Sequence, residues 1–201
     1  MLAIVKDGSI TATGNIKQLF PNTSFAGGVA NAEFKTAEGV KDIVQGERKD
    51  QKYYYVTQGN VELVDGVPTQ KYTNTAKRLE DEDAKDEDGK QLYVQVWDAD
   101  YDNGAGKAKG KMVDSSEKLV NQGLKTAMTA QVKATANSLL AKTDWMIIRK
   151  AERDVAIPSA TETYRAAVIS ETSRLETAIG NAGDVDALAA VMAGQNWPQE
   201  D

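Results

Sequence analysis

The stretch from Gln91 to Lys111, QLYVQVWDADYDNGAGKAKGK, separates two kinds of hydrophobic periodicity in the chain. In QLYVQVW the apolar side chains alternate between two faces, which is the period of a β-strand. The second half, DNGAGKAKGK, is rich in glycine and lysine and is typical of a linker. From Asp114 onward the apolar residues recur at helical spacing. The stretch therefore predicts a boundary between a β domain and a helical module.

Short strands are expected before this boundary. LAIV and SITAT flank the pair Asp7-Gly8, and NVELV and VPTQKYT flank the pair Asp65-Gly66. Asp-Gly supplies the two positive φ angles of a type I′ turn, so both pairs predict β-hairpins. The triplet Tyr53 to Tyr55 would place rings on both faces of a strand, one face in the core and the other open to a carbohydrate or protein contact.

Helices are expected after the boundary. Asp114 and Glu117 have the spacing of a capping box, which predicts a long first helix ending near Ala141. A second, shorter helix is expected after Asp144, which would act as its N-cap. A third is expected to follow Pro158, where SATE has the S-x-x-E capping pattern, and DVDALAAVMA predicts a short last helix.

These patterns together predict an α+β fold, with a small N-terminal antiparallel β domain followed by a C-terminal module of about four helices. The expected division is residues 1–101 for the β domain, 102–113 for the Gly/Lys-rich linker, 114–196 for the helical module and 197–201 for the tail.

The net charge of −6 and the pI near 4.9 bear on the partners of the chain. Both argue against nucleic-acid binding, which needs a basic face, and against adsorption to an anionic membrane. No apolar run approaches the roughly 18 residues of a membrane-spanning helix. The start, MLAIVKDGSI, has too short an apolar run for a signal peptide. We therefore expect no nucleic-acid or membrane partner and synthesis in the cytoplasm.

The chain contains no histidine and no cysteine. Its residues therefore cannot form a Ser-His-Asp triad, a histidine-ligated zinc site or a reactive thiolate. A hydrolase that works with two positioned carboxylates stays an alternative, although no pair of acids stands out from a solvated run. We expect a protein without catalytic residues and without a cofactor.

Three motifs are similar to ligand-binding motifs. DADYDNG, residues 98–104, alternates carboxylates as a calcium loop does, but Asn103 and Lys109 stand where an EF-hand needs glycine and glutamate. A looser divalent site and an Asx-rich turn both stay open. GAGKAKGK lacks the spacing and the hydroxyl of a phosphate-binding loop. The acidic run EDEDAKDED, residues 80–88, is either a solvated loop or a cation site, or it pairs with the linker lysines. We expect no metal site.

The stretch LLAKTDWMIIRKAERDVAIPSATETYR, residues 139–165, combines large apolar residues with a basic cluster. It is either a structural corner between helices, partly filled by Trp145, Ile147 and Ile148, or a docking surface. Trp197 in the tail either folds back onto the helices or anchors the tail in a partner. The candidate partner-binding residues are Trp145, Arg149, Lys150, Arg153, Tyr164, Arg165 and Trp197.

LLAKTDW, a short charged connection, a proline-led helix start and YRAAV, in this order, resemble the C-terminal module of the bacteriophage tail assembly chaperone family. The match covers roughly residues 131–175. MIIRKAERDVAIP is apolar and basic where many members have a loop with proline and aspartate, and YRAAVIS lacks the glutamine and second arginine of the family's Tyr-Arg-Gln-x-Leu-Arg. The residues that fit the pattern are Leu139, Leu140, Asp144, Trp145, Tyr164 and Arg165.

AIVKDGSI with LFPNTSF resembles the small β modules that open accessory proteins encoded beside phage tail-fibre genes. The two resemblances imply protein-protein contact with a phage tail, fibre or baseplate protein. The chain would act as an assembly chaperone in the host cytoplasm, or it would stay in the virion at the tail, baseplate or fibre junction. Homo-oligomerisation is left open.

Overall fold

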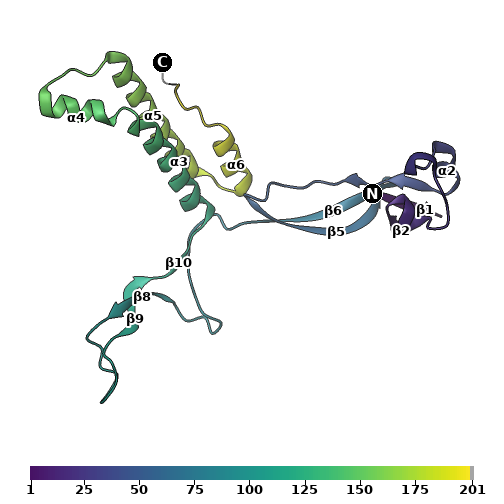
Figure 1. The fold of residues 1–201 in the computed structure, drawn as a ribbon, viewed down its shortest axis with the longest axis horizontal. Coiled ribbons are helices and arrows are strands. Elements are labelled where there is room, and N and C mark those ends of the chain that lie inside the picture. Colours follow the sequence, from purple (N-terminus) through teal and green to yellow (C-terminus); the bar gives the residue numbers. More distant parts are fainter. Residues whose placement is uncertain (200–201) are drawn as a thin grey trace. The chain divides into compact units, whose positions relative to one another are not determined.

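The computed structural model describes residues 1–199 and has the α+β fold that the sequence predicts, with β elements first and a helical module after them (Figure 1). The chain divides into two compact units between Ala76 and Lys77. Residues 102–113, the predicted linker, form the loop of a hairpin and the start of its second strand. The strands after Ala76 therefore belong to the same unit as the helices.

The first unit begins with a three-stranded antiparallel sheet in the order β2-β1-β3. The strands are β1 (Leu2–Lys6), β2 (Ser9–Gly14) and β3 (Val40–Asp42). Asp7 and Gly8 have φ of 51° and 72°, which confirms the predicted turn of the first hairpin. Between β2 and β3 lie α1 (Ile16–Leu19), η1 (Ala26–Gly28) and α2 (Ala32–Ala37). Phe20 after α1, Phe25 before η1 and Phe34 within α2 form an edge-to-face cluster.

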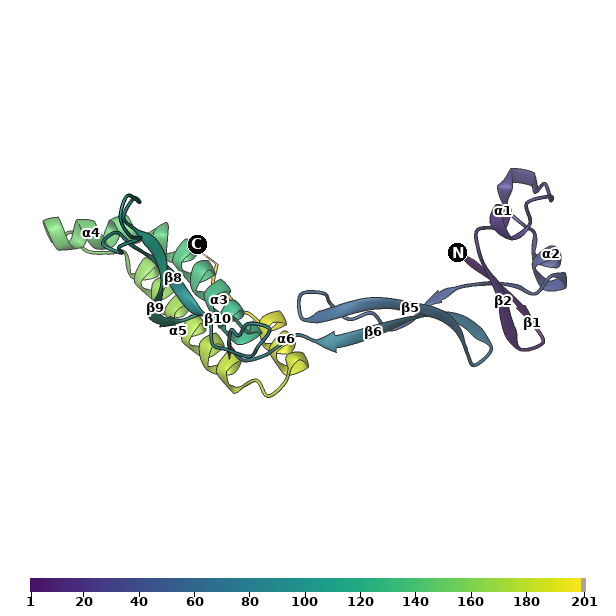
Figure 2. The ribbon, with the colours of Figure 1, turned by 90° about the horizontal axis from the view of Figure 1, so that it is seen from below.

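A second sheet in the first unit has the order β4-β6-β5. The long hairpin of β5 (Tyr54–Val64) and β6 (Val67–Ala76) turns at Asp65-Gly66, again with both φ angles positive, as predicted (Figure 2). β4 (Val44–Gln45) pairs with β6 in parallel, so the domain is not wholly antiparallel. Tyr53 and Tyr54 are buried and Tyr55 is exposed.

The second unit opens with two small two-stranded sheets. β7 (Glu82–Asp83) pairs with β10 (Val120–Asn121), and β8 (Tyr93–Asp98) pairs with β9 (Lys111–Lys118). The prediction of a helix from Asp114 is therefore wrong, because residues 111–118 and 120–121 are strands paired with segments that lie up to 39 residues earlier in the chain. The capping box of Asp114 and Glu117 does not exist, since both residues lie in β9.

Four helices follow: α3 (Leu124–Ala141), α4 (Asp144–Arg153), α5 (Ser159–Asn181) and α6 (Val185–Ala193). Their number is as expected, and α3, α5 and α6 share a core. Leu124, Met128, Val132 and Ala136 recur four residues apart along α3 and are buried, as helical spacing predicts. The fully buried apolar side chains of this core are Val132, Val168, Leu175, Ile179 and Leu188.

The start of the acidic run is docked at the N-terminus of α3 and is not a freely solvated loop. The backbone amides of Leu124 and Lys125 donate to the carbonyls of residues 78 and 79 at 2.9 and 3.0 Å. The Asp81 carboxylate accepts from the Gly123 amide at 2.7 Å and from Thr126 Oγ1 at 2.9 Å. These two bonds, the Gly123 bond above all, lower the pKa of Asp81. The carboxylate thus satisfies the Gly123 amide at the N-cap of α3.

Candidate functional site

The corner that joins α3, α4 and α5 is built around Arg165 of α5. Its Nη1 donates to the Leu140 carbonyl at 2.9 Å, to Thr143 Oγ1 at 2.7 Å and to Asp144 Oδ1 at 2.8 Å. Thr143 is almost fully buried and occupies the N-cap position of α4, so Asp144 is not the cap but the first helical residue. The guanidinium therefore ties the end of α3 and the start of α4 to α5.

Tyr164 and Trp197 pack inside the helical module. Tyr164 is 8% exposed and lies in a cluster with Ala136 and Val168. Leu140 and Trp197 pack against this cluster, and Trp197 Nε1 donates to Gln195 Oε1 at 2.8 Å. Of the two alternatives for Trp197, the structure has this residue folded back onto the helices.

The Tyr164 hydroxyl is buried and has no hydrogen-bond partner within residues 1–199. Because a buried unpaired hydroxyl costs about 1 to 3 kcal/mol, we expect Tyr164→Phe to stabilise the helical module by about 1 kcal/mol in urea unfolding. Tyr72→Phe is the matched control, since the Tyr72 hydroxyl bonds Gln45 Oε1 at 2.5 Å and its loss should destabilise the first unit. If the Tyr164→Phe protein were less stable than the parent, the Tyr164 hydroxyl could not be buried without a hydrogen-bond partner as described.

Glu171 of α5 holds the turn that leads to Trp197. Its carboxylate, 9% exposed, accepts from Arg174 Nε and Nη2 at 2.7 Å each and from the Asn196 amide at 2.7 Å. Arg174 Nη2 also donates to the Gly194 carbonyl at 3.0 Å. The bonds from Arg174 lower the pKa of Glu171, and the Asn196 amide lowers it further, while burial opposes them.

We call the bonds of Glu171 with Arg174 and the Asn196 amide the Glu171 clamp. This clamp predicts that acid releases Trp197 from the helices. A lowered folded pKa means that the stabilisation is complete above about pH 4.5, the ordinary value, and is lost as the pH falls through the folded pKa. In a Trp97→Phe/Trp145→Phe chain, whose remaining tryptophan is Trp197, we expect the emission to shift to the red below pH 4.5. Adding Glu171→Gln should move this shift to neutral pH. A Trp197 emission that changes only when the helices unfold would refute the clamp.

Helix α4 exposes its largest apolar side chains. Trp145, Ile147 and Ile148 are 52%, 39% and 56% exposed, and α4 has no buried residue. We call these three residues the α4 surface. The expectation that some of them fill the corner between helices is wrong, since the corner is filled by Leu139, Leu140 and Tyr164.

The orientation of α4 explains this exposure. At about 100° per residue, the α4 surface spans one side of the helix, and Met146 and Lys150 lie on the other. Met146 lines a cleft of about 520 Å³ together with Ala160 and Ala167 of α5. Lys150 forms an ion pair with Glu162 of α5 at 3.7 Å. The side of α4 that faces α5 is therefore the one without the large aromatic and branched residues.

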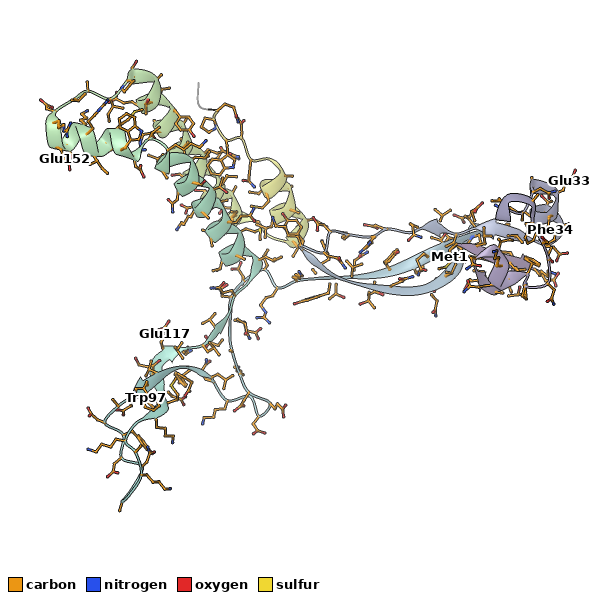
Figure 3. All side chains as sticks on the ribbon, in the orientation of Figure 1. Met1, Glu33, Phe34, Trp97, Glu117 and Glu152 are labelled. Atoms are coloured by element: carbon orange, nitrogen blue, oxygen red, sulfur yellow. The ribbon has the colours of Figure 1, made fainter. Side chains whose placement is uncertain are left out.

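The basic residues of α4 have different surroundings. The Arg149 guanidinium lies 4.8 Å from the Trp145 ring centre, in cation–π geometry. Arg153 is exposed in the last turn of α4. In Figure 3, Glu152 marks the end of α4 that is remote from α3. Of the seven predicted contact residues, Trp145, Arg149, Lys150 and Arg153 thus share α4, and Tyr164, Arg165 and Trp197 support the module from within.

The β8–β9 hairpin also carries exposed apolar residues, which the sequence analysis did not single out as contacts. Trp97 lies opposite Met112, and Val96 lies opposite Val113. Trp97, Met112 and Val96 are exposed, and Figure 3 shows Trp97 on this hairpin. Since paired residues share a face and neighbours alternate, both faces of the hairpin are apolar. Isolated two-stranded hairpins are marginally stable in water.

The calcium-like segment and the acidic run are held by hydrogen bonds and ion pairs within the chain. Asp98 accepts from the Asp100 amide at 3.0 Å and Asp102 from the Gly104 amide at 2.8 Å, so the calcium-like segment forms Asx turns. Among residues 1–199, no group of three or more acidic side chains is arranged to hold a metal ion. In the acidic run, Glu80 pairs with Lys125 at 2.5 Å and Asp83 with Lys118 at 2.5 Å, and neither lysine lies in the predicted linker.

No protein-family model, curated protein or solved structure matches the chain. Within the part of the chain that the structure describes, no helix is both long and apolar enough to cross a membrane.

Proposed function

We propose that this chain is a non-enzymatic bacteriophage tail-region protein that acts by protein-protein contact, as an assembly chaperone for a tail or tail-fibre protein. It binds an immature tail, fibre or baseplate protein in the host cytoplasm through the α4 surface. No residue type in the chain supplies an imidazole or a thiolate, which agrees with a role in binding rather than turnover.

The observation that carries the proposal is the exposed apolar surface. Trp145, Ile147 and Ile148 on α4 are 39% to 56% exposed. Trp97, Val96 and Met112 on the β8–β9 hairpin are 44% to 62% exposed. Contiguous exposed apolar residues mark interaction sites in soluble proteins.

The phage assignment is supported by the resemblance of residues 131–175 to tail assembly chaperones. Five of the six residues that carry it meet in one corner: Arg165 bonds the Leu140 carbonyl and Asp144, and Tyr164 packs with Leu139 and Leu140. The sixth, Trp145, lies on the α4 surface. The corner residues hold the start of α4 in place, and Trp145 is exposed on this helix. This arrangement is consistent with a docking role.

The alternative is a permanent virion component at the tail, baseplate or fibre junction. The β8–β9 hairpin favours it, because a second apolar surface besides α4 would let the chain bridge two partners. In a component held between partners, the hairpin would also pack against a partner surface, which an isolated two-stranded hairpin lacks.

Two measurements test the role. The chain is co-expressed with the tail and fibre proteins encoded beside it, and we expect one of them to co-purify in a fixed ratio. Mass spectrometry of purified particles then separates the two roles, since a chaperone is absent from the particle and a structural component is present in stoichiometric amount. Failure of every neighbouring tail protein to co-purify, with the chain also absent from particles, would refute both.

A further inference from the structure

We propose that the cleft beside the start of α5 binds a small organic carboxylate with an apolar body. The cleft has a volume of about 520 Å³ and lies within the second unit. Its walls come from α4 with Met146, from α5 with Ala160 and Ala167, and from the tail with Pro198 and Gln199. The inference goes beyond the proposed function, because it concerns a small ligand and a place in the fold other than the α4 surface.

The first argument is the N-terminus of α5. Pro158 takes the N-cap position of this 23-residue helix, and no side chain caps it. Glu162 is the first residue of α5 whose amide is bonded within residues 1–199, to the Pro158 carbonyl at 3.1 Å. The amides of the three preceding residues, 159–161, have no acceptor in this part of the chain, and all three residues line the cleft. Because free amides at a helix start attract anions, this end of the cleft favours a negative charge.

The second argument is the Tyr164 hydroxyl. Tyr164 lines the same cleft and is 8% exposed, and its hydroxyl has no hydrogen-bond partner within residues 1–199. Long side chains in helices point back toward the N-terminus, so the hydroxyl lies on the side of the free amides. Water can bond exposed amides, but a buried hydroxyl without a partner costs stability. A ligand that accepts hydrogen bonds from both groups explains why the chain keeps this cost.

The lining of the cleft indicates the class of ligand. None of the lining residues in the described part of the chain carries a charge. The acid in the first turn of α5, Glu162, is paired with Lys150 at 3.7 Å. One negative charge suits the amides and the hydroxyl, whereas a phosphate dianion is typically bound with an arginine or a lysine. The methionine, alanine and proline side chains of the cleft then contact an apolar body of the ligand.

The test compares phenylacetate with its uncharged analogue phenylacetamide and with inorganic phosphate. Each is titrated into the full ¹⁵N-labelled chain, and the amide shifts of residues 159–161 locate the binding. We expect phenylacetate to bind at least about five-fold more tightly than phenylacetamide, as an anion does at a partly buried helix N-terminus. Phosphate should bind more weakly than phenylacetate, because no lysine or arginine of the described chain lines the cleft.

Two pairs of variants test the roles of the lining residues. Tyr164→Phe removes the hydroxyl donor and should weaken phenylacetate binding about ten-fold, although it should make the module more stable. Tyr72→Phe is its matched control, since the Tyr72 hydroxyl bonds Gln45 in the first unit, and it should leave the affinity unchanged. Ala167→Leu narrows the cleft and should weaken binding. Ala166→Leu adds the same side chain at an exposed position outside the lining and should not.

A Glu200→Gln/Asp201→Asn chain is titrated as well, because these two acids follow Gln199 of the cleft in the sequence. Equal affinity in this chain and in the parent supports an external ligand. The proposal is overturned if phenylacetate leaves the amides of residues 159–161 unshifted, binds no more tightly than phenylacetamide or phosphate, or binds Tyr164→Phe as well as the parent. It is also overturned if binding occurs only in the Glu200→Gln/Asp201→Asn chain, since the chain's own acids would then fill the cleft.

Discussion

Replacing Arg165 with alanine is expected to destabilise the helical module by about 3 kcal/mol. The side chain is 18% exposed, and one nitrogen serves a carbonyl, a hydroxyl and a carboxylate at 2.7 to 2.9 Å. Hydrogen bonds from a charged donor contribute about 1.5 to 3 kcal/mol, and the buried Thr143 hydroxyl and the Leu140 carbonyl would lose this donor. The start of α4 would also lose its tie to α5.

Urea unfolding monitored by circular dichroism measures this effect. Arg165→Lys keeps the charge but not the planar guanidinium, and it should recover only part of the stability. Lys150→Ala removes an exposed ion pair at 3.7 Å and should change the free energy of unfolding by less than about 0.5 kcal/mol. If Arg165→Ala were no more destabilising than Lys150→Ala, the corner would not be held as we describe.

Gly123→Ala is expected to cost about 3 kcal/mol, at the upper end of overpacking substitutions. A Cβ at this position would lie 2.4 Å from the backbone carbon and oxygen of Glu80 and 2.6 Å from the Leu79 oxygen. The new methyl group meets backbone that is itself bonded to the start of α3, through the amides of Leu124 and Lys125. The backbone of residues 79–80 must therefore shift away from the helix.

Gly180→Ala is the matched control for this substitution. Gly180 lies in the last turn of α5 with a negative φ and no heavy atom within 4 Å of an added Cβ, so alanine should stabilise the module by about 0.5 to 1 kcal/mol. Thermal and urea unfolding of both variants give the comparison. Equal stability of Gly123→Ala and the parent would mean that residues 79–80 do not dock on α3.

The parts of the fold that could be predicted are those specified by local residues. Asp7-Gly8 and Asp65-Gly66 fix their turns because few other pairs adopt two positive φ angles, and flanking strands of suitable pattern then pair with their neighbours. The last helix begins where the Asp184 side chain accepts from the Ala187 amide at 2.7 Å, a bond between residues three apart.

The parts that could not be predicted depend on distant residues. Asp114 and Glu117 have helical spacing, but β9 pairs with β8 across a loop, and β10 pairs with β7. The SATE capping pattern also fails, because Pro158 takes the N-cap position and Glu162 faces Lys150. Asp81 sits in an acidic run typical of solvated loops, although it is bonded to residues more than 40 positions later.

The candidate site also has features that could be predicted from the sequence and features that could not. The resemblance singled out Asp144, Tyr164 and Arg165 together, and the structure brings them to one corner. It did not indicate that Ile147 and Ile148 are exposed, because a run of large apolar residues beside a corner normally predicts burial. Only the rotation of α4 about its axis, which turns Met146 and Lys150 toward α5, places them outside.

The most direct test of the α4 surface is the affinity of a folded Trp145→Ala/Arg149→Glu chain for the co-purifying tail or fibre protein. Both side chains are exposed or half-buried on α4 and neither takes part in the Arg165 corner, so circular dichroism should show the parent's helix content. We expect the double variant to lose binding by at least about 100-fold, as hot-spot residues do. Unchanged affinity in a folded double variant would contradict α4 as the contact surface.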